Sequence, residues 1–277
     1  MATGGRNDLA LFIDFENVAL GLHHGRDRTF DIQKVLERML EKGKIIVKRA
    51  YADWSRFSNY TRPFHEAAIE LIEIPRQAST GKNSADIRLC VDAMDLCYAK
   101  EHIDTFVIIS GDSDFSPLVS KLRENGKCVI GLGLRDSTSN LLVSNCDEFI
   151  FYESLVQPAV EAGAEEVEKP EIEKGEVLTL VTDTVTALLR EGRDPIQASL
   201  VKDTIKRKQP SFDEAEFGYR SFTDLLEDAQ SEKLIELRED SRSGTYLVTL
   251  TKPKAKPRSR GGRRRRAKPA APKTEAP

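Results

Sequence analysis

Short apolar runs and amphipathic segments alternate along the first half of the chain. Continuous apolar runs, typical of strands buried on both faces, occur at residues 9–13, 45–52, 106–109 and 128–134, and an alternating run suited to an edge strand occurs at 71–74. Apolar positions with helical spacing lie between them, at residues 31–42, 62–69, 84–100 and 117–124. We expect the last of these helices to begin with Ser116 as its N-cap and Pro117 at its first position. The alternation predicts an α/β fold with a parallel sheet and helices on both faces.

The second half of the chain has a different pattern. Helical spacing occurs at residues 178–189, 196–206 and 219–230. Two strand-like runs follow at 234–239 and 245–250, and the turn sequence DSRSG between them predicts a hairpin. Three helices and a terminal hairpin predict a small winged-helix domain.

The net charge of −3 hides a strong segregation of charge along the chain. The stretch EAGAEEVEKPEIEKGE, residues 161–176, is mostly acidic, whereas the chain from Lys252 onward is basic and contains four consecutive arginines. Both segments have the composition of disordered chain. The predicted organisation is an α/β domain, an acidic disordered linker, a winged-helix domain and a disordered basic tail, at residues 1–155, 156–176, 177–251 and 252–277.

Composition narrows the class of protein and the kind of metal site. With 39% hydrophobic and 31% charged residues, and no apolar run near the roughly 18 residues that span a membrane, we expect a cytoplasmic protein without a secretory signal. The four cysteines and four histidines form no C-x-x-C or H-E-x-x-H pattern. Any metal ion is therefore expected to be bound by oxygen atoms.

Carboxylates follow two of the predicted buried strands. Asp14 comes directly after the first strand, and Asp112 and Asp114 come just after the strand at 106–109. Asp86 lies in the first turn of the third predicted helix. In a parallel sheet, ligands bind outside the carboxyl ends of the strands, near the point where the strand order reverses. If the strands predicted at residues 9–13 and 106–109 are neighbours, the four carboxylates converge on one pocket.

Each carboxylate also has a structural explanation. Asp86 could complement the helix dipole, Asp112 and Asp114 could be turn and cap residues, and Asp14 could be a solvated loop residue. Several acids in one cleft, however, repel one another unless a cation is present. Oxygen ligands alone suit Mg²⁺ or Mn²⁺, and the corresponding chemistry is phosphodiester hydrolysis.

Three motifs in the first domain carry a family resemblance. They are FIDFENV at residues 12–18, GKNSADIRLCVDAM at 81–94 and IISGDSDFSPLV at 108–119, and GKCVIGLG follows them. In this order they resemble the NYN domains of the LabA-like group, within the PIN-like nucleases, over most of residues 8–152. The resemblance implies a PIN-like, Rossmannoid α/β/α sandwich and a metal-dependent ribonuclease, with endonuclease action favoured over exonuclease action. It also leaves room for a homodimer.

The resemblance assigns roles to individual residues. Asp14 would be the metal ligand of the first strand, and Asp86, Asp112 and Asp114 would complete a catalytic set that binds Mg²⁺ or Mn²⁺. We rank Asp92 lower, because its helical position places it on a polar face. The candidates for RNA contact are Asn17, Lys82, Ser110, Arg263, Arg264, Arg265 and Arg266.

The second domain resembles the OST-HTH or LOTUS domain. The specific match is QPSFDEAEFGYRSFTDLLEDA, residues 209–229. The resemblance implies RNA binding or docking onto a protein partner. Basic contacts are offered by Lys202, Lys206, Arg207, Lys208 and Arg220, but the middle of the domain is acidic, so both kinds of partner stay open.

Two alternatives to a ribonuclease remain. One is a noncatalytic RNA-binding or regulatory adaptor that keeps the PIN-like fold. The other is a Toprim-like nucleotidyl-transferring or DNA-cleaving domain, which also combines an acid after the first strand with a later D-x-D. A Toprim domain places a glutamate at the end of that strand, whereas this strand ends in Asp14 and Glu16 lies beyond it. The PIN-like assignment is therefore favoured.

Overall fold

The computed structural model describes residues 7–23, 29–74, 84–156, 171–239 and 245–251. Within these ranges no helix combines the length and apolar character needed to cross a membrane. The first domain contains a six-stranded sheet whose adjacent strands are all parallel, which confirms the predicted α/β fold class. Its strand order is β3-β2-β1-β4-β5-β6. The strands are β1 (Asp8–Asp14), β2 (Lys44–Ala52), β3 (Glu70–Glu73), β4 (Thr105–Ile109), β5 (Cys128–Gly133) and β6 (Glu148–Phe151).

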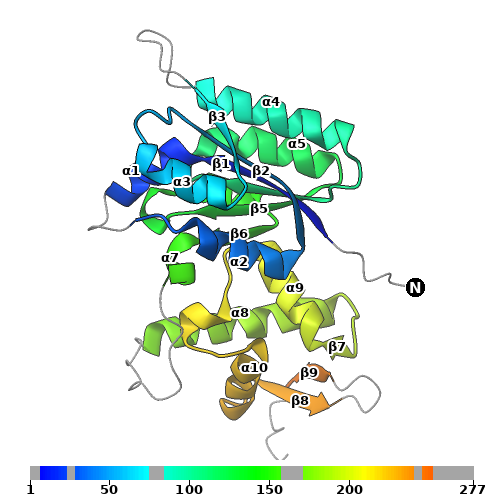
Figure 1. The fold of residues 1–277 in the computed structure, drawn as a ribbon. Coiled ribbons are helices and arrows are strands. Elements are labelled where there is room, and N and C mark those ends of the chain that lie inside the picture. Colours follow the sequence, from blue (N-terminus) through cyan, green and yellow to red (C-terminus); the bar gives the residue numbers. More distant parts are fainter. Residues whose placement is uncertain (1–6, 24–28, 75–83, 157–170, 240–244, 252–277) are drawn as a thin grey trace, which may run out of the picture.

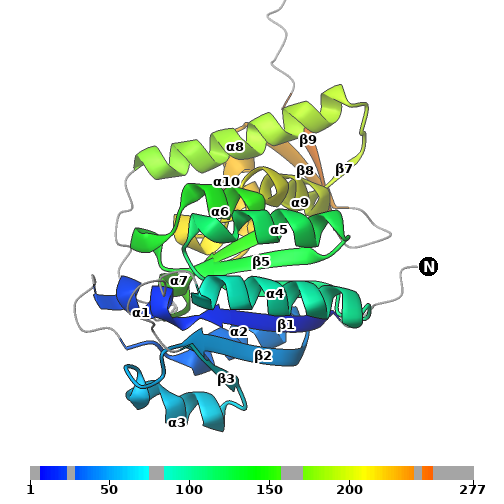
Figure 2. The ribbon, with the colours of Figure 1, turned by 90° about the horizontal axis from the view of Figure 1, so that it is seen from above.

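Helices cover both faces of this sheet (Figures 1 and 2). One core cluster joins the sheet to α1 (Phe15–His23), α2 (Ile32–Lys42), α3 (Ser58–Glu66) and α7 (Tyr152–Val156). A second cluster, on the opposite face, joins it to α4 (Ser84–Ala99), α5 (Ser116–Glu124) and α6 (Asn140–Asn145). Because every central strand is covered twice, its apolar run is continuous, as the sequence pattern indicated.

The strand order reverses between β1 and β4. From β1 the chain builds β2 and β3 on one side, and later β4, β5 and β6 on the other. Strands β1 and β4 are hydrogen-bonded neighbours, with Ile13 opposite Ile109. The condition for convergence of the predicted carboxylates is therefore met, because Asp14 and the loop after Ile109 leave the sheet side by side at its switch point.

Some local predictions differ from the structure. Helix α1 and strand β6 were not anticipated, because both are short and follow another element with almost no turn residues between them. Ser116 is the first residue of α5 and not its N-cap, which is Phe115. The Ser116 hydroxyl is buried and finds no hydrogen-bond partner in the described part of the chain. The capping carboxylate is instead Asp112, which accepts from the Asp114 N–H at the start of the 3₁₀ turn η2 (Ser113–Phe115).

The second domain combines helices with a three-stranded antiparallel sheet of order β7-β9-β8, in agreement with the predicted winged-helix pattern. Helix α8 begins inside the stretch predicted to be a disordered linker. Residues 171–176 are helical, and Lys174 forms an ion pair with Asp228 at 3.1 Å, an interaction that composition does not reveal. The elements are α8 (Glu171–Arg190), β7 (Ile196–Gln197), α9 (Ala198–Lys208), the 3₁₀ turn η4 (Glu214–Phe217), α10 (Phe222–Ser231), β8 (Ile235–Glu239) and β9 (Tyr246–Leu250).

The second domain packs against edge strand β6 of the first (Figure 1). The Phe149 N–H of β6 donates to the Pro210 carbonyl at 2.8 Å, so the second domain satisfies a donor that an edge strand would leave open. Beside it, the Glu148 carboxylate accepts from Lys42 of α2 at 2.7 Å and from Lys206 of α9 at 3.0 Å. Backbone and charged contacts therefore hold the two domains together.

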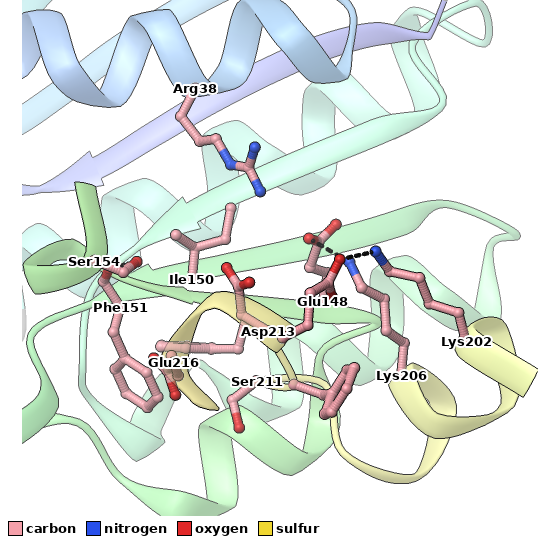
Figure 3. Close-up of a pocket in the computed structure, with 13 residues that line it drawn as sticks. Arg38, Glu148, Ile150, Phe151, Ser154, Lys202, Lys206, Ser211, Asp213 and Glu216 are labelled. Carbon is pink, nitrogen blue, oxygen red and sulfur yellow. Dashed lines mark hydrogen bonds and ion pairs between the residues drawn. The ribbon is translucent and has the colours of Figure 1, made fainter. Parts of the chain in front are cut away.

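Two lysines of helix α9 form ion pairs with carboxylates within the molecule. Lys206 binds Glu148 of the first domain (Figure 3). Lys202 binds Glu214 of its own domain. Both lysines were expected to offer basic contacts, either to RNA or to a protein partner. In the structure their ammonium groups are paired with carboxylates, which leaves the exposed Arg207 and Lys208 as the open basic side chains at the end of this helix.

Candidate active site at the switch point

The position of Asp14 is set by the apolar residues around it. Asp14 is the last residue of β1 and is 4% exposed. The next residue, Phe15, is completely buried, and its ring lies 5.5 Å from Trp54 and 5.1 Å from Phe64. This aromatic cluster fixes the backbone just after the strand, so Asp14 cannot turn out into solvent as a loop residue would.

A network of hydrogen bonds connects Asp14 to the loop after β4. The Ser110 hydroxyl donates to Asp14 Oδ2 at 2.9 Å, and the Asp112 N–H donates to the same Ser110 oxygen at 3.2 Å. The Asn17 N–H donates to Asp14 Oδ1 at 3.3 Å, while the Asn17 side-chain oxygen accepts from the Gly111 N–H at 2.8 Å. Asn17 and the buried Ser110 thus join the ends of β1 and β4. Their contact with RNA stays a prediction.

Asp112 and Asp114 lie in the turn that leaves β4. Asp112 Oδ1 accepts from the Asp114 N–H at 2.9 Å, which holds the turn closed. Asp112 is half-buried and Asp114 is exposed. Asp112 therefore acts as a cap, as its structural explanation required, and its second carboxylate oxygen, Oδ2, accepts no hydrogen bond from the residues that the structure describes.

Asp86 approaches the same place from a different element. It lies in the first turn of α4, half-buried. Burial and the negative charges of Asp112, Asp114 and Glu16 raise its pKa to about 6. These carboxylates act on Asp86 only because they are close to it, since charge interactions weaken with distance and with solvent screening.

The pKa of Asp14 is raised further than that of Asp86. Burial, followed by the charge of Asp86, raises its pKa to about 7, although the hydrogen bond from Ser110 opposes the shift. A carboxylic acid with such a pKa carries a proton part of the time near neutral pH. The structure therefore brings Asp14, Asp86, Asp112 and Asp114 to one end of the sheet, where their charges oppose one another.

Glu16 is a fifth carboxylate at this place, and the sequence reasoning did not include it in the site. It lies in the first turn of α1 and adds to the charge that raises the pKa of Asp86. Its carboxylate accepts from the Asp53 N–H at 3.1 Å and lies 3.8 Å from Arg56. The signal available in the sequence was its place in FIDFEN, two residues beyond Asp14.

Other predicted residues lie apart from this cluster. Asp92 accepts from the Tyr51 hydroxyl at 2.9 Å and from Arg88 Nε at 3.0 Å, which agrees with the low rank given to it as a site residue. Lys82 and the arginines 263–266 lie outside the described residues, and their contact with RNA stays a prediction.

The donor chemistry of the cluster suits a hard divalent cation. All its candidate ligands are carboxylate oxygens, which Mg²⁺ and Mn²⁺ prefer, and these ions keep several waters and need few protein ligands. A cation would also relieve the repulsion that raises the pKa values of Asp14 and Asp86. Among the described residues, however, no three or more His, Cys, Asp or Glu side chains are arranged ready to hold an ion. The fit is therefore one of ligand type and charge.

Comparison with known proteins defines the class. The sequence profile of the NYN domain matches residues 8–154, and the chain belongs to this family of PIN-like nuclease domains. The profile of the OST-HTH/LOTUS domain matches residues 176–247. Both resemblances drawn from the motifs are confirmed. PIN-like nucleases typically use divalent metal ions, and a nuclease-like domain joined to a helix-turn-helix domain suggests binding to nucleic acid.

Two individual proteins resemble this chain, one in sequence and one in fold. The chain is 30% identical over 150 residues to "Uncharacterized protein MJ0482" of Methanocaldococcus jannaschii, and the match covers 53% of this chain and 55% of that protein. The chain thus spans about half the length of this relative. The crystal structure of VPA0982, a protein of unknown function from Vibrio parahaemolyticus, superposes with a TM-score of 0.50 at 20% identity, covering 56% of this chain and 98% of that one. That similarity concerns the fold alone.

Proposed function

We propose that this protein is a metal-dependent ribonuclease that hydrolyses RNA phosphodiester bonds at the switch point of its NYN domain. The observation that carries the proposal is the meeting of buried and half-buried carboxylates at the switch point, where Ser110 bridges Asp14 and the Asp112 backbone. Asp14 and Asp86 come from different elements, yet burial and neighbouring carboxylates raise the pKa of each. Groups crowded in this way at the ligand-binding edge of a parallel sheet are characteristic of functional sites.

The four aspartates would have two roles, holding the cation and orienting the attacking water. Asp14, Asp86, Asp112 and Asp114 would hold Mg²⁺ or Mn²⁺, which when bound supplies charge neutralisation at the phosphate and a more acidic water. Asp86 is half-buried and so lies within reach of solvent, where a carboxylate oxygen that does not hold the ion could orient an attacking water.

RNA would reach the site through positive charge elsewhere in the chain. Arg207 and Lys208 are exposed at the end of α9, and Lys82 and arginines 263–266 add charge in segments outside the described residues. Contacts of this kind bind phosphate without regard to sequence and weaken as salt rises. The second domain would recruit RNA or a protein partner.

Cleavage of end-labelled RNA tests the proposal. Wild-type protein, Asp112→Asn and the control Asp95→Asn, which changes an exposed residue of α4, are incubated with single-stranded and structured RNAs in Mn²⁺, Mg²⁺ or EDTA. We expect internal cuts by the wild type and the control in divalent metal only, and at least about a hundredfold slower cleavage by Asp112→Asn. Equal products from all three proteins, or cleavage that persists in EDTA, would contradict the proposal.

A noncatalytic RNA-binding adaptor is the second candidate. It is favoured by the absence, among the residues that the structure describes, of carboxylates already arranged around an ion. The adaptor predicts that RNA affinity is the same in the wild type and in Asp112→Asn, with no cleavage by either. The same set of proteins, measured by filter binding, separates the two functions.

A further inference from the structure

The second domain contacts the turn that follows β5 in the first domain. This turn is the 3₁₀ segment η3 (Arg135–Ser137). The Arg135 guanidinium donates to the carboxylate of Glu216 in η4 and lies over the Phe151 ring at 4.2 Å from its centre. Figure 3 shows Glu216 and Phe151 together at this part of the interface. An arginine held by both an ion pair and an aromatic face has little freedom of orientation.

The backbone of the same turn is also held. The Arg135 N–H donates to the Glu153 carboxylate at 3.0 Å, and the Thr138 hydroxyl donates to the Leu134 carbonyl at 2.6 Å. The turn is therefore fixed from the first domain through its backbone and from the second domain through the Arg135 side chain.

The turn packs directly on the loop that carries Asp112. The Ser139 N–H donates to the Gly111 carbonyl at 2.9 Å. Gly111 has no space for a side chain, because a Cβ atom there would lie 2.7 Å from the Ser137 carbonyl oxygen. On its other side Gly111 donates to Asn17, which in turn donates to Asp14. The η3 turn and the residues just after it thus pack against the backbone of the loop that carries Asp112.

We propose that Glu216 and Arg135 are positioning residues for the acidic site. Their ion pair holds the η3 turn against the Gly111–Asp112 loop. The role follows from the contacts above: the Glu216–Arg135 ion pair joins the second domain to the η3 turn, and Arg135 begins the segment that packs on Gly111. The two partners are 28% and 50% exposed, so the interaction is partly screened and its effect is moderate. The inference rests on the proposed function of the acidic site, but the exchange measurement below does not depend on cleavage.

Hydrogen exchange of the intact chain, followed by mass spectrometry, tests the proposal. The proteins compared are the wild type, Glu216→Gln, Arg135→Gln and the double variant. Exchange of residues 108–118 is expected to rise about two- to fivefold in each single variant, as for the loss of a partly exposed ion pair. Because the two residues act through each other, the double variant should exchange no faster than either single variant.

The control is Glu236→Gln. It removes a carboxylate from an exposed ion pair with Arg238 on β8, in the same domain, and should leave residues 108–118 unchanged. Unchanged Trp54 fluorescence establishes that each variant keeps its first domain folded. Equal exchange in the wild type and both single variants, additive effects in the double variant, or the same rise in the control would overturn the proposal.

Cleavage kinetics give a second readout. With RNA as substrate and Mn²⁺ present, Glu216→Gln should lower kcat about two- to fivefold with little change in KM, since the loop positions reacting groups and does not bind the bulk of the substrate. A rise in KM alone would assign Glu216 to RNA binding and contradict the positioning role. If the wild type shows no cleavage, the proposed function fails, whereas the exchange result still decides the coupling between the domains.

Discussion

The raised pKa of Asp14 makes a quantitative prediction for stability. In the folded protein the pKa is about 7, against an ordinary value of 3.8. Between these values the unfolded chain has lost its proton while the folded chain still holds it. The free energy of unfolding therefore falls as the pH rises through this window and levels off above pH 7. Asparagine does not titrate, so Asp14→Asn escapes this loss.

The magnitude follows from the size of the shift. One pKa unit corresponds to about 1.4 kcal/mol, so the loss of stability is about 2 kcal/mol at pH 5 and about 4 kcal/mol at pH 8. The advantage of Asp14→Asn over the wild type should grow by about 2–3 kcal/mol between these pH values. Replacing the hydrogen bond with Ser110 costs about 1 kcal/mol, but that cost is the same at both pH values and cancels from the difference.

Urea unfolding followed by tryptophan fluorescence measures this difference. Trp54 is the single tryptophan of the chain and stacks on Phe15, next to Asp14, so its emission reports on the first domain. The experiment is done in EDTA, because a divalent cation would neutralise the repulsion. The control is Asp183→Asn, which changes an exposed residue of α8.

The reasoning would be refuted by an advantage of Asp14→Asn that is equal at pH 5 and pH 8. That result would mean that Asp14 is ionised throughout this range in the folded protein, and that burial and crowding do not act on it as described. A similar pH-dependent gain in Asp183→Asn would show that the effect is general to the protein's charge and not local to the site.

Two further predictions concern the packing around the site and between the domains. Gly111→Ala should lower the free energy of unfolding by about 1–3 kcal/mol in urea titrations, because its Cβ would meet the Ser137 carbonyl oxygen. The control Gly175→Ala lies near the start of α8, where an added Cβ meets open space, and should raise the free energy of unfolding by up to about 1 kcal/mol. Equal effects would contradict the close approach at Gly111. Burial alone would raise the pKa of Glu148, but the hydrogen bond from Lys42 and the charge of Lys206 outweigh it and lower the pKa. Glu148→Gln should therefore lower the free energy of unfolding by about 2 kcal/mol at neutral pH, and by progressively less as the pH falls below 4.5. Thermal unfolding followed by circular dichroism measures this loss. A loss that does not decline in acid would show that the charge of Glu148 does not stabilise the fold.

The main features of the fold could be predicted because they depend on local patterns. Buried parallel strands require continuous apolar runs, and the runs at residues 9–13 and 106–109 are followed at once by Asp14 and by the Asp112 turn. The class of fold and the candidate carboxylates both follow from this pattern. That the two strands are neighbours could only be stated as a condition, because register and strand order are tertiary properties.

The remaining features depend on contacts between distant residues. Glu16 was not placed in the site because it projects from α1, a helix whose start has no sequence signal of its own. Lys206 was expected to offer a basic contact to RNA or to a protein partner, but it pairs with Glu148, which lies 58 residues earlier in the chain. The protonation of Asp14 depends on how completely its neighbours exclude water, which no pattern of residue types specifies.

The central claim is that the four aspartates form one site for a divalent cation. Titration of Mn²⁺ into the intact protein at pH 8, with free Mn²⁺ followed by electron paramagnetic resonance, measures this directly. We expect saturable binding to the wild type and to the control Asp95→Asn, and binding at least about tenfold weaker in both Asp86→Asn and Asp112→Asn, since each removes a ligand from the same ion. Equal Mn²⁺ binding by all four proteins, or no saturable binding by the wild type, would contradict the account.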